Sequence, residues 1–316
     1  MQRKHFLAVT IALAAAAALA PRLARGAKPH DDDDYYALHD QETIRKTYTL
    51  TAAQKSLEVD NVWGSIEVTG TNSNEIQVVV TRTNQAETQQ KLDRAKKEVT
   101  LDVNQQADSL TLYVNGPFRC GNYRNGCGGG CGGNGCGGCG NGCGGCNGCD
   151  REGYNVKMDF QIQVPRAIDV DVRTVMSGHV RMENVSGHFS VRNVNGPVEL
   201  ARVSGSGRAS TVNGGVKASF AENPRENSIF NTVNGNIELY FTKNLSADFR
   251  FKTMNGGIYT DYEMTSLPVR MVKEEREGTR VIFRADRSSG ARVGSGGPEI
   301  SAENLNGNIR ILENHE

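Results

Sequence analysis

The sequence has no net charge, with 36 basic and 36 acidic side chains among its 316 residues. It therefore lacks the overall positive field by which proteins attract nucleic acid or acidic membranes. Beyond the first 26 residues it also contains no apolar run long enough to span a bilayer. We therefore expect no nucleic-acid partner, and no transmembrane segment in the mature chain.

The sequence also lacks the local motifs of common enzymes, since it has no serine nucleophile motif, no phosphate-cradling glycine loop and no zinc-protease helix. The pairs of titratable residues that could converge on a site are His179 with His188, Asp169 with Asp171, and Asp261 with Glu263. The two histidines both follow Ser-Gly but lie one repeat unit apart, which should place them on different faces. The acidic pairs alternate along strands and should face solvent. We expect no catalytic residues and no enzyme.

The first 26 residues have the pattern of a secretory signal peptide. Arg3 and Lys4 precede an uncharged stretch from residue 6 to residue 20, and the small residues Ala24 and Gly26 offer a cleavage site before Ala27. An uncleaved anchor or an organelle transit peptide is the alternative. The pattern predicts export to a periplasm, a cell surface or the medium, with residues 27–43 as an acidic disordered tail.

One phrase recurs through the second half of the chain: an apolar residue followed by Asn-Gly. Its asparagines are Asn195, Asn213, Asn234, Asn255 and Asn306, and the first four are separated by 18, 21 and 21 residues. Each phrase precedes an apolar-x-apolar stretch, so that a short strand follows a tight turn. Such turns are typical of hairpins, in which strands run in opposite directions, but also of a β-solenoid, in which coils stack in parallel.

Two columns of equivalent residues favour the solenoid, with coils of about twenty residues. The position two residues before each of these asparagines holds Asn193, Thr211, Thr232, Thr253 and Asn304, all small and polar. The outward position of the following strand holds Glu199, Lys217, Glu238, Tyr259 and Arg310. Stacking would place Glu199 beside Lys217 and Lys217 beside Glu238, an attractive order of charges. At the corner, Asn tolerates the left-handed backbone region, and Gly has no Cβ atom that could clash with neighbouring atoms.

The pattern extends toward the N-terminus. Residues 57–68 are a degenerate copy in which Trp63 replaces the asparagine. Residues 87–99 place Leu92, Ala95 and Val99 on one helical face, which predicts a short helix over about residues 87–98. Residues 99–103 and 110–114 predict a strand pair, and residues 156–164 alternate strictly. We therefore expect residues 44–114 to form the N-terminal part of the solenoid and residues 154–316 its main repeats.

All eight cysteines lie between Cys120 and Cys149, within a glycine-rich insertion at residues 115–153. Its densest part contains C-x-x-C spacings, which zinc and iron–sulfur sites use: Cys136, Cys139, Cys143, Cys146 and Cys149. Nothing apolar or imidazole-bearing accompanies them. A disordered, variably oxidised loop is therefore favoured over a metal site for zinc or another thiophilic metal, and over a disulfide knot or intermolecular cross-links.

Two runs of the sequence carry a resemblance to a known family. They are VPRAIDVDVRTVMSGHVRMENVSGHFSVRNVNG, from Val164 to Gly196, and GSGGPEISAENLNGNIRI, from Gly294 to Ile311. They resemble the putative-adhesin domain family of bacteria over roughly residues 45–115 and 154–316. The resemblance implies an exported β-solenoid, mostly without assigned activity, and supplies no catalytic residues. The cysteine-rich insertion departs from the family pattern.

The sequence thus predicts an all-β, single-stranded β-solenoid that serves as an exported, non-enzymatic adhesin or envelope scaffold. Its partner would be a polysaccharide or protein of the cell surface or envelope, and no cofactor is expected. A metal- or thiol-binding protein acting through the cysteine-rich loop is the alternative. A polysaccharide-active enzyme ranks third.

Overall fold

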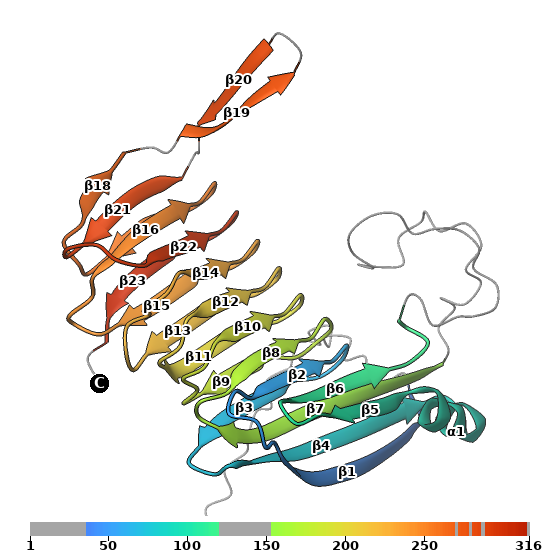
Figure 1. Cartoon of the computed structure of the whole chain (residues 1–316). Coiled ribbons are helices and arrows are strands. Elements are labelled where there is room, and N and C mark those ends of the chain that lie inside the picture. The colour runs from blue at the N-terminus through green and yellow to red at the C-terminus, as the bar shows by residue number, and fades with distance from the viewer. Residues whose placement is uncertain (1–35, 120–152, 269–270, 278–279, 286–287, 315–316) are drawn as a thin grey trace, which may run out of the picture. The chain divides into compact units, whose positions relative to one another are not determined.

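The computed structural model describes residues 36–119, 153–268, 271–277, 280–285 and 288–314. The predicted signal peptide and the acidic run at residues 30–34 lie outside the described residues. Within them, the chain is all-β apart from one helix, and its strands form two large mixed sheets and a separate two-stranded ribbon. Figure 1 shows successive strands of the two sheets stacked as rungs.

The larger sheets are here called sheet A and sheet B. The order of strands in sheet A is β1 (Leu38–Thr49), β4 (Glu75–Ala86), β7 (Tyr154–Pro165), β3 (Ile66–Thr71), β9 (Val180–Glu183), β11 (Val198–Val203), β13 (Val216–Phe220), β15 (Ile237–Phe241), β23 (Ile309–Glu313) and β17 (Ile258–Thr260).

The order of strands in sheet B is β18 (Thr265–Leu267), β21 (Ser289–Val293), β16 (Ala247–Lys252), β22 (Glu299–Glu303), β14 (Ser228–Asn231), β12 (Gly207–Ser210), β10 (Phe189–Arg192), β8 (Asp169–Arg173), β2 (Ser56–Asp60), β6 (Ser109–Asn115) and β5 (Thr100–Gln105). The ribbon pairs β19 (Met271–Glu277) with β20 (Arg280–Ala285) in antiparallel register.

Each coil contributes one strand to each sheet, and the strands of neighbouring coils pair in parallel. Val180, Val198 and Val216 are register partners on β9, β11 and β13, and Val170 and Phe189 are partners on β8 and β10. The prediction of parallel stacking, as opposed to hairpins, is confirmed by these registers. The inward residues of the coils are almost fully buried between the sheets, and each such side chain contributes about 1.5–3 kcal/mol to folding.

The order of the last coils differs from their order in the sequence. Strand β23 pairs in parallel with β15 on one side and with β17 on the other, and β22 lies likewise between β14 and β16. The C-terminal coil is therefore inserted between two earlier coils. If the coils stacked in the order of the sequence, Tyr259 would lie beside Glu238 and Arg310 would lie at the end of the column. In the structure Arg310 lies beside Glu238 and Tyr259 lies at the end, so Glu238 has a cationic neighbour.

Asparagine and glycine act at the corners through contacts between coils. The corner asparagines are not among the described non-glycine residues with positive φ, which are Ser177, Asn184 and Arg202, so the expected left-handed asparagine is wrong. Gly307 does have a φ of +136°, and a Cβ atom there would lie 2.1 Å from the carbonyl oxygen of Gly235 in the neighbouring coil. Close approach of neighbouring backbones is therefore what requires glycine.

The N-terminal region covers one end of the coils. Strands β1, β4 and β7 pair in antiparallel register, β5 pairs with β6 as predicted, and β7 joins β3 in parallel. Helix α1 (Gln89–Glu98) follows the cap residue Thr88, whose hydroxyl accepts a bond from the Lys91 amide, and contacts β4 and β7. The predicted helical face is confirmed, because Leu92, Ala95 and Val99 are buried.

Strand β1 begins at Leu38, inside the range 27–43 that the sequence predicts to be a disordered tail. Residues 38–43 are therefore strand and not tail. The reason is the long antiparallel pairing of β1 with β4, which satisfies the backbone without an apolar face of its own. Asp40 of this strand is held by Lys96 of α1 at 2.9 Å, and this bond lowers the pKa of the carboxyl group.

Candidate functional site

The cysteines predicted as metal ligands, Cys136, Cys139, Cys143, Cys146 and Cys149, lie outside the described residues. The structure therefore neither brings them together nor separates them. Among the residues it does describe, no group of three or more His, Cys, Asp or Glu side chains is arranged to hold a metal ion. The metal and disulfide alternatives for the insertion remain predictions.

The two histidines lie on different sheets, as predicted. His179 directly precedes β9 of sheet A, and His188 directly precedes β10 of sheet B. The side chain of His188 lies 3.6 Å from Glu226, and its backbone amide donates to Asp169 at 2.8 Å. Both side chains of the His188–Glu226 pair are more than half exposed. The contact is therefore a solvated surface pair.

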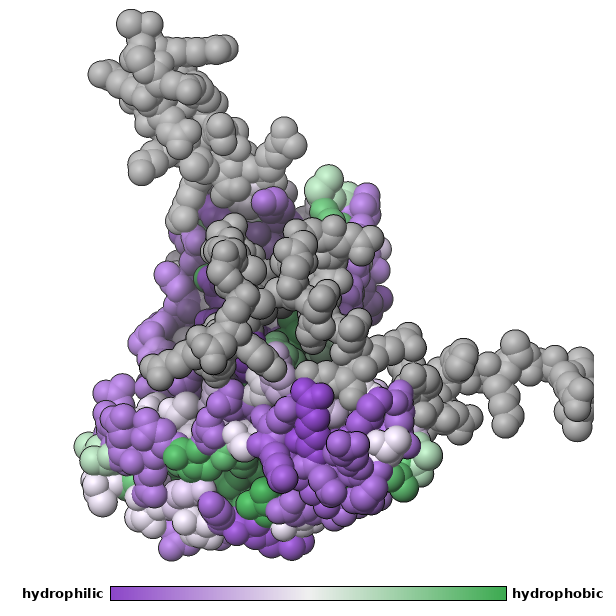
Figure 2. Space-filling model, turned by 90° about the vertical axis from the view of Figure 1, so that its right-hand side faces the viewer, coloured by the Kyte–Doolittle hydropathy of each residue, from purple (hydrophilic) through white to green (hydrophobic). Residues whose placement is uncertain are grey.

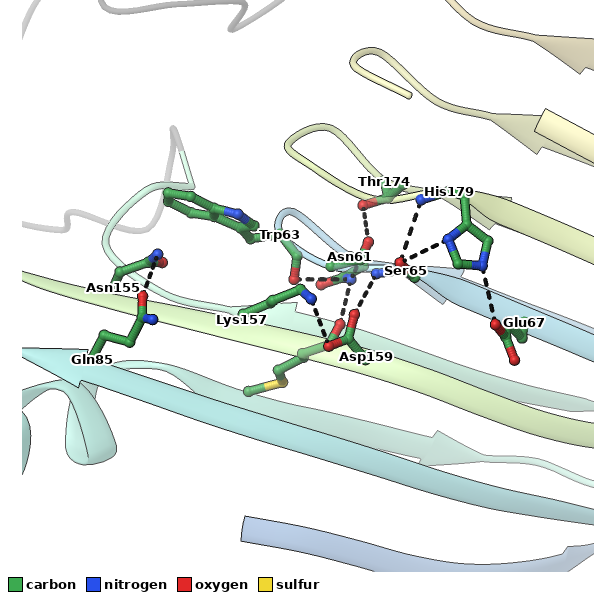
Figure 3. Close-up of polar contacts among 12 residues, drawn as sticks. Asn61, Trp63, Ser65, Glu67, Gln85, Asn155, Lys157, Asp159, Thr174 and His179 are labelled. Carbon is green, nitrogen blue, oxygen red and sulfur yellow. Dashed lines mark hydrogen bonds and ion pairs between the residues drawn. The ribbon is translucent and has the colours of Figure 1, made fainter. Parts of the chain in front are cut away.

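His179 belongs to a polar cluster that the sequence analysis did not find. Its Nδ1 atom lies 3.2 Å from the Ser65 hydroxyl, and its Nε2 atom lies 3.0 Å from a Glu67 carboxylate oxygen (Figure 3). Glu67 lies on the outer face of β3, and Ser65 directly precedes that strand. The clue available in the sequence was the degenerate repeat at residues 62–68, because aligning Gly64 with Gly178 sets Ser65 beside His179.

A serine, a histidine and a carboxylate in contact are the components of a nucleophilic triad, but the surroundings differ from a hydrolase site. The Ser65 amide already donates to Asp159 at 2.8 Å, and Asp159 also pairs with Lys157 at 3.0 Å (Figure 3). His179 and Glu67 have side-chain exposures of 46% and 41%. The geometry of the cluster is that of cross-strand bonding on an open sheet face.

The acidic pairs also have local explanations. Asp169 accepts bonds from His188 and Gln54 and lines a hollow of about 440 Å³ between residues 53–55 and the turn before β10. Asp171 follows on the same face of β8, next to Glu58 in register. Arg173 lies 2.7 Å from Glu58 and 3.9 Å from Asp171, so it offsets the repulsion between the two carboxylates.

Asp261 and Glu263 are exposed, as predicted, but Tyr262 between them is not. The Tyr262 hydroxyl donates to the carbonyl oxygens of Phe241 and Thr242 at 2.9 and 3.2 Å. Burial raises the pKa of Tyr262 to about 12, with further contributions from Glu313 and Asp261. This tyrosine is a structural link between coils.

The most extensive arrangement of functional groups is a ladder of charges on the outer face of sheet A, here called the charge ladder. Its register partners, in spatial order, are Glu67, Arg181, Glu199, Lys217, Glu238, Arg310 and Tyr259. The predicted order Glu199, Lys217, Glu238 is confirmed. Opposite charges alternate along strands about 4.8 Å apart, so each charge has attractive neighbours.

Direct ion pairs hold parts of the charge ladder. Arg181 contacts Glu199 at 2.7 Å, and Arg310 contacts Glu238 at 2.6 Å. Hydrogen bonds from Arg181 to Glu183 and Glu199 raise the pKa of its guanidinium group. These side chains are partly exposed, which leaves them accessible to a ligand.

A second ladder runs along the adjacent corner, and is here called the amide ladder. In the series Asn195, Asn213, Asn234, Asn306 and Asn255, each asparagine side chain after the first donates to the side-chain oxygen of the one before it, at distances of 2.8, 2.9, 2.8 and 2.7 Å. All five side chains are exposed. Bonds of this kind fix the amide groups at the spacing of the coils.

Apolar residues accompany the amide ladder on the same corner. Those among them that the structure exposes are Met176, Val212, Leu305 and Met254. On the face seen in Figure 2, the described side chains are mainly hydrophilic, and apolar ones gather in limited areas. The corner of the coils thus presents exposed apolar side chains beside the exposed amide groups.

The stacked coils place the protein among β-solenoid-like folds. Residues 155–291 match the family model described as Toastrack DUF4097. The chain is therefore similar to the Toastrack family over these residues, and its resemblance to an adhesin-like domain of unknown function is confirmed. Comparison with curated proteins gives no match.

Solved structures give distant likenesses. A putative cell adhesion protein from Clostridium sporogenes ATCC 15579 is 10% identical, with a TM-score of 0.41 over 87% of this chain and 100% of that chain. A putative adhesin from Bacteroides fragilis NCTC 9343 is 11% identical, with a TM-score of 0.36 over 86% and 97%. A putative lipid binding protein from Parabacteroides distasonis ATCC 8503 is 10% identical, with a TM-score of 0.24 over 86% and 96%.

The described part of the chain contains no helix with the length and apolar content needed to cross a membrane.

Proposed function

We propose that the protein is an exported, non-enzymatic adhesin-like protein whose solenoid binds a polymer of the cell envelope or cell surface. The observation that carries the proposal is the charge ladder together with the amide ladder. Both repeat at the spacing of the coils, so one surface presents the same few groups many times. Repeated weak contacts along a chain of like units add up to a useful affinity.

Support for a non-enzymatic role comes from how the titratable groups are used. The Ser65–His179–Glu67 cluster bonds across two strands on an open face, and Asp169 and Asp171 are held by neighbours on their own sheet. The Toastrack match is to a domain without an assigned activity, which fits this reading. Binding by a pre-formed, flat surface is the use that these arrangements fit.

The proposal is tested by pulldown of the purified protein against cell-wall polysaccharide, whole cells and envelope extracts. We expect one of these materials to retain the protein, in a manner that weakens with salt because the ladder groups are charged. Retention by none of the three would leave adhesion without support. Cell fractionation, with N-terminal sequencing of the exported form, tests the predicted export and cleavage before Ala27.

Variants locate the binding surface. Replacing Glu199→Gln and Glu238→Gln together removes two charges from the ladder with little change in shape, and we expect retention to fall several-fold. Arg208→Gln is the matched control, because Arg208 is exposed on the outer face of β12 in the opposite sheet. Equal losses from the ladder and control variants would place the binding surface elsewhere.

A further inference from the structure

The asparagines of the amide ladder are each followed by glycine, which is the setting in which an asparagine side chain loses its amide group most readily. Glycine has no Cβ atom, so its backbone nitrogen can approach the preceding side chain without hindrance. The reaction needs two freedoms. The asparagine side chain must turn toward the backbone of the next residue, and the glycine amide must give up its proton. Hydrogen bonds to either group therefore oppose it.

The pairs inside the stack are restrained on both counts. The side-chain oxygen of each asparagine accepts a bond from the next amide of the ladder. The glycine amide of each pair donates to the asparagine carbonyl oxygen of the next coil at 2.9 or 3.0 Å, and these donors are Gly196, Gly214, Gly235 and Gly307. The same glycines are half-buried. Reaction at any of these pairs must break bonds to a neighbouring coil.

Asn255 and Gly256, at the end of the amide ladder, lack these restraints. The Asn255 side chain donates to Asn306 at 2.7 Å, but no described residue donates to its own side-chain oxygen. The Gly256 amide has no acceptor among the described residues, and both residues are exposed. The cause is the order of the coils. Because the C-terminal coil lies between Asn234 and Asn255, Asn255 ends the ladder and no described coil follows it.

We propose that Asn255 is a site of spontaneous deamidation in the folded protein, and that stacking of the coils protects the other asparagines of the amide ladder. Hydroxide or a buffer base takes the proton of the Gly256 amide, and the nitrogen attacks the side-chain carbonyl carbon of Asn255. The new N–C bond closes a succinimide ring while the bond to the side-chain nitrogen breaks. That nitrogen takes up a proton and leaves as ammonia. Water then opens the ring at either carbonyl and gives aspartate or isoaspartate.

The reaction changes the last rung of the amide ladder. The bond from Asn255 to the Asn306 oxygen needs a donor, and a carboxylate has none, so two acceptors would face each other. Isoaspartate also routes the main chain through the former side chain, which displaces the carbonyl oxygen that accepts the Gly307 amide. Both products add a negative charge. The damage should stay in the end coil, because each coil depends mainly on its direct neighbours.

Incubation of the purified protein at mildly alkaline pH, followed by tryptic digestion and mass spectrometry, tests the proposal. Trypsin separates the asparagines of the ladder, because a lysine or arginine lies between each and the next along the sequence. We expect the peptide of residues 253–270 to convert at least about tenfold faster than the others, since they must first break the restraining bonds. The converted peptide should contain both aspartate and isoaspartate at position 255. The remaining Asn-Gly pairs, within residues 115–148, fall in other peptides.

The same protein unfolded in urea is the control for the local sequence. Every pair is then free of its coil, so the rates of all ladder asparagines should agree within a few-fold. Asn255→Gln is the matched variant, because it keeps an amide at this position while its longer side chain closes a ring far more slowly. Its peptide of residues 253–270 should keep its original mass over the same incubation.

Several results would overturn the proposal. In the folded protein, conversion of Asn255 no faster than that of the internal asparagines shows that its position at the end gives no freedom. An equal advantage of Asn255 in urea assigns the difference to sequence and not to the fold. Aspartate as the sole product excludes the succinimide route.

Hydrogen exchange of Asn255→Asp tests the effect on the last rung. We expect the Gly307 amide, which donates to the Asn255 carbonyl oxygen at 3.0 Å, to exchange several-fold faster than in the unmodified protein. The Gly214 amide, which donates within the stack, is the internal control and should keep its rate. Unchanged exchange at Gly307 would contradict the effect proposed for the carboxylate.

Discussion

At the scale of single residues, the small polar side chain two positions before each corner asparagine bonds to a glycine carbonyl of the neighbouring coil. Thr211 donates to Gly196 at 2.8 Å, and Thr232 donates to Gly214 at the same distance. Asn304 uses its amide for the same purpose and reaches Gly235 at 3.2 Å. Threonine and asparagine are interchangeable at this position because the side chain of each places a hydrogen-bond donor within bonding distance of the same carbonyl group. These side chains are nearly buried.

The backbone of the neighbouring coil also explains why glycine follows the asparagine in the recurring phrase. Because neighbouring corners approach so closely, a Cβ atom at Gly235 would lie 2.0 Å from the carbonyl oxygen of Gly214. That carbonyl oxygen also accepts the bond from Thr232. The recurring phrase therefore combines a side-chain donor, a ladder amide and a residue without a side chain, and each of the three serves contact between coils.

Tyr262 gives a prediction at this scale. Its pKa of about 12 in the folded protein lies above the ordinary tyrosine value of 10.0, so the folded protein favours the neutral phenol. The stability that the phenol contributes is complete below pH 10 and is lost as pH rises toward 12. Tyr262→Phe removes the one O–H donor that the carbonyl oxygens of Phe241 and Thr242 share, and we expect it to lower the free energy of unfolding by about 1 kcal/mol at pH 7.

Urea unfolding of both proteins between pH 7 and pH 11.5 measures this effect. The difference in unfolding free energy between the native protein and Tyr262→Phe should narrow once the pH exceeds 10. The difference in phenolate absorbance between the two folded proteins should titrate near pH 12. A constant stability difference, together with titration near pH 10, would contradict the role given to burial.

At the scale of elements, the strand order β15, β23, β17 rests on pairings that a point variant can test. Arg310 lies between Glu238 and Tyr259 in register, and it contacts Glu238 at 2.6 Å. Arg310→Glu would place two carboxylates on adjacent strands. We expect it to lower the free energy of unfolding by up to about 1 kcal/mol, as like charges directly opposite each other do.

Arg208→Glu is the control for this prediction. Arg208 lies on an outer sheet face too, but its register partners are Ser190 and Ile229, which carry no charge. The measurement is chemical unfolding at low salt, repeated at high salt, where the effect of Arg310→Glu should shrink. Equal effects of the two variants would argue against β23 lying beside β15.

The repeated coils could be predicted from the sequence because the same phrase recurs at each corner and each strand alternates. The position of the C-terminal coil could not, because a repeat shows which residues are equivalent but not which coils are neighbours. Strand β1 was missed for another reason: charged residues such as Asp40, Glu42 and Arg45 obscure any alternation on an edge strand. The Ser65–His179 contact depends on β3 lying beside β9, a pairing across more than a hundred residues.

At the scale of the whole molecule, the inserted coil determines how the stack can assemble. Strands β16 and β17 precede β22 and β23 in the sequence, yet they pair in parallel with them and not with β14 and β15. The amide ladder shows the same gap, since Asn306 joins Asn234 to Asn255. Among the described pairings, β16 and β17 are therefore joined to β14 and β15 only through the C-terminal coil.

This arrangement predicts an unusual effect of truncation. Removing residues 299–316 takes away an internal coil, so β16 and β17 lose the strands that link them to the rest of the stack. We expect hydrogen-exchange protection to disappear over Ala247–Lys252 and Ile258–Thr260, while β9, β11 and β13 stay protected because each coil depends mainly on its direct neighbours. The thermal unfolding transition should become broader or split.

Removing residues 36–49 is the matched control, because β1 is an outermost strand that pairs with β4 alone. Its loss should expose β4 and leave the remaining coils protected. If the C-terminal truncation behaves in the same limited way, with β16 and β17 still protected, then the last coil is not needed to join them to β14 and β15. The order of coils would then be set by the 228–260 segment alone, and the C-terminal coil would add to a stack that is already closed.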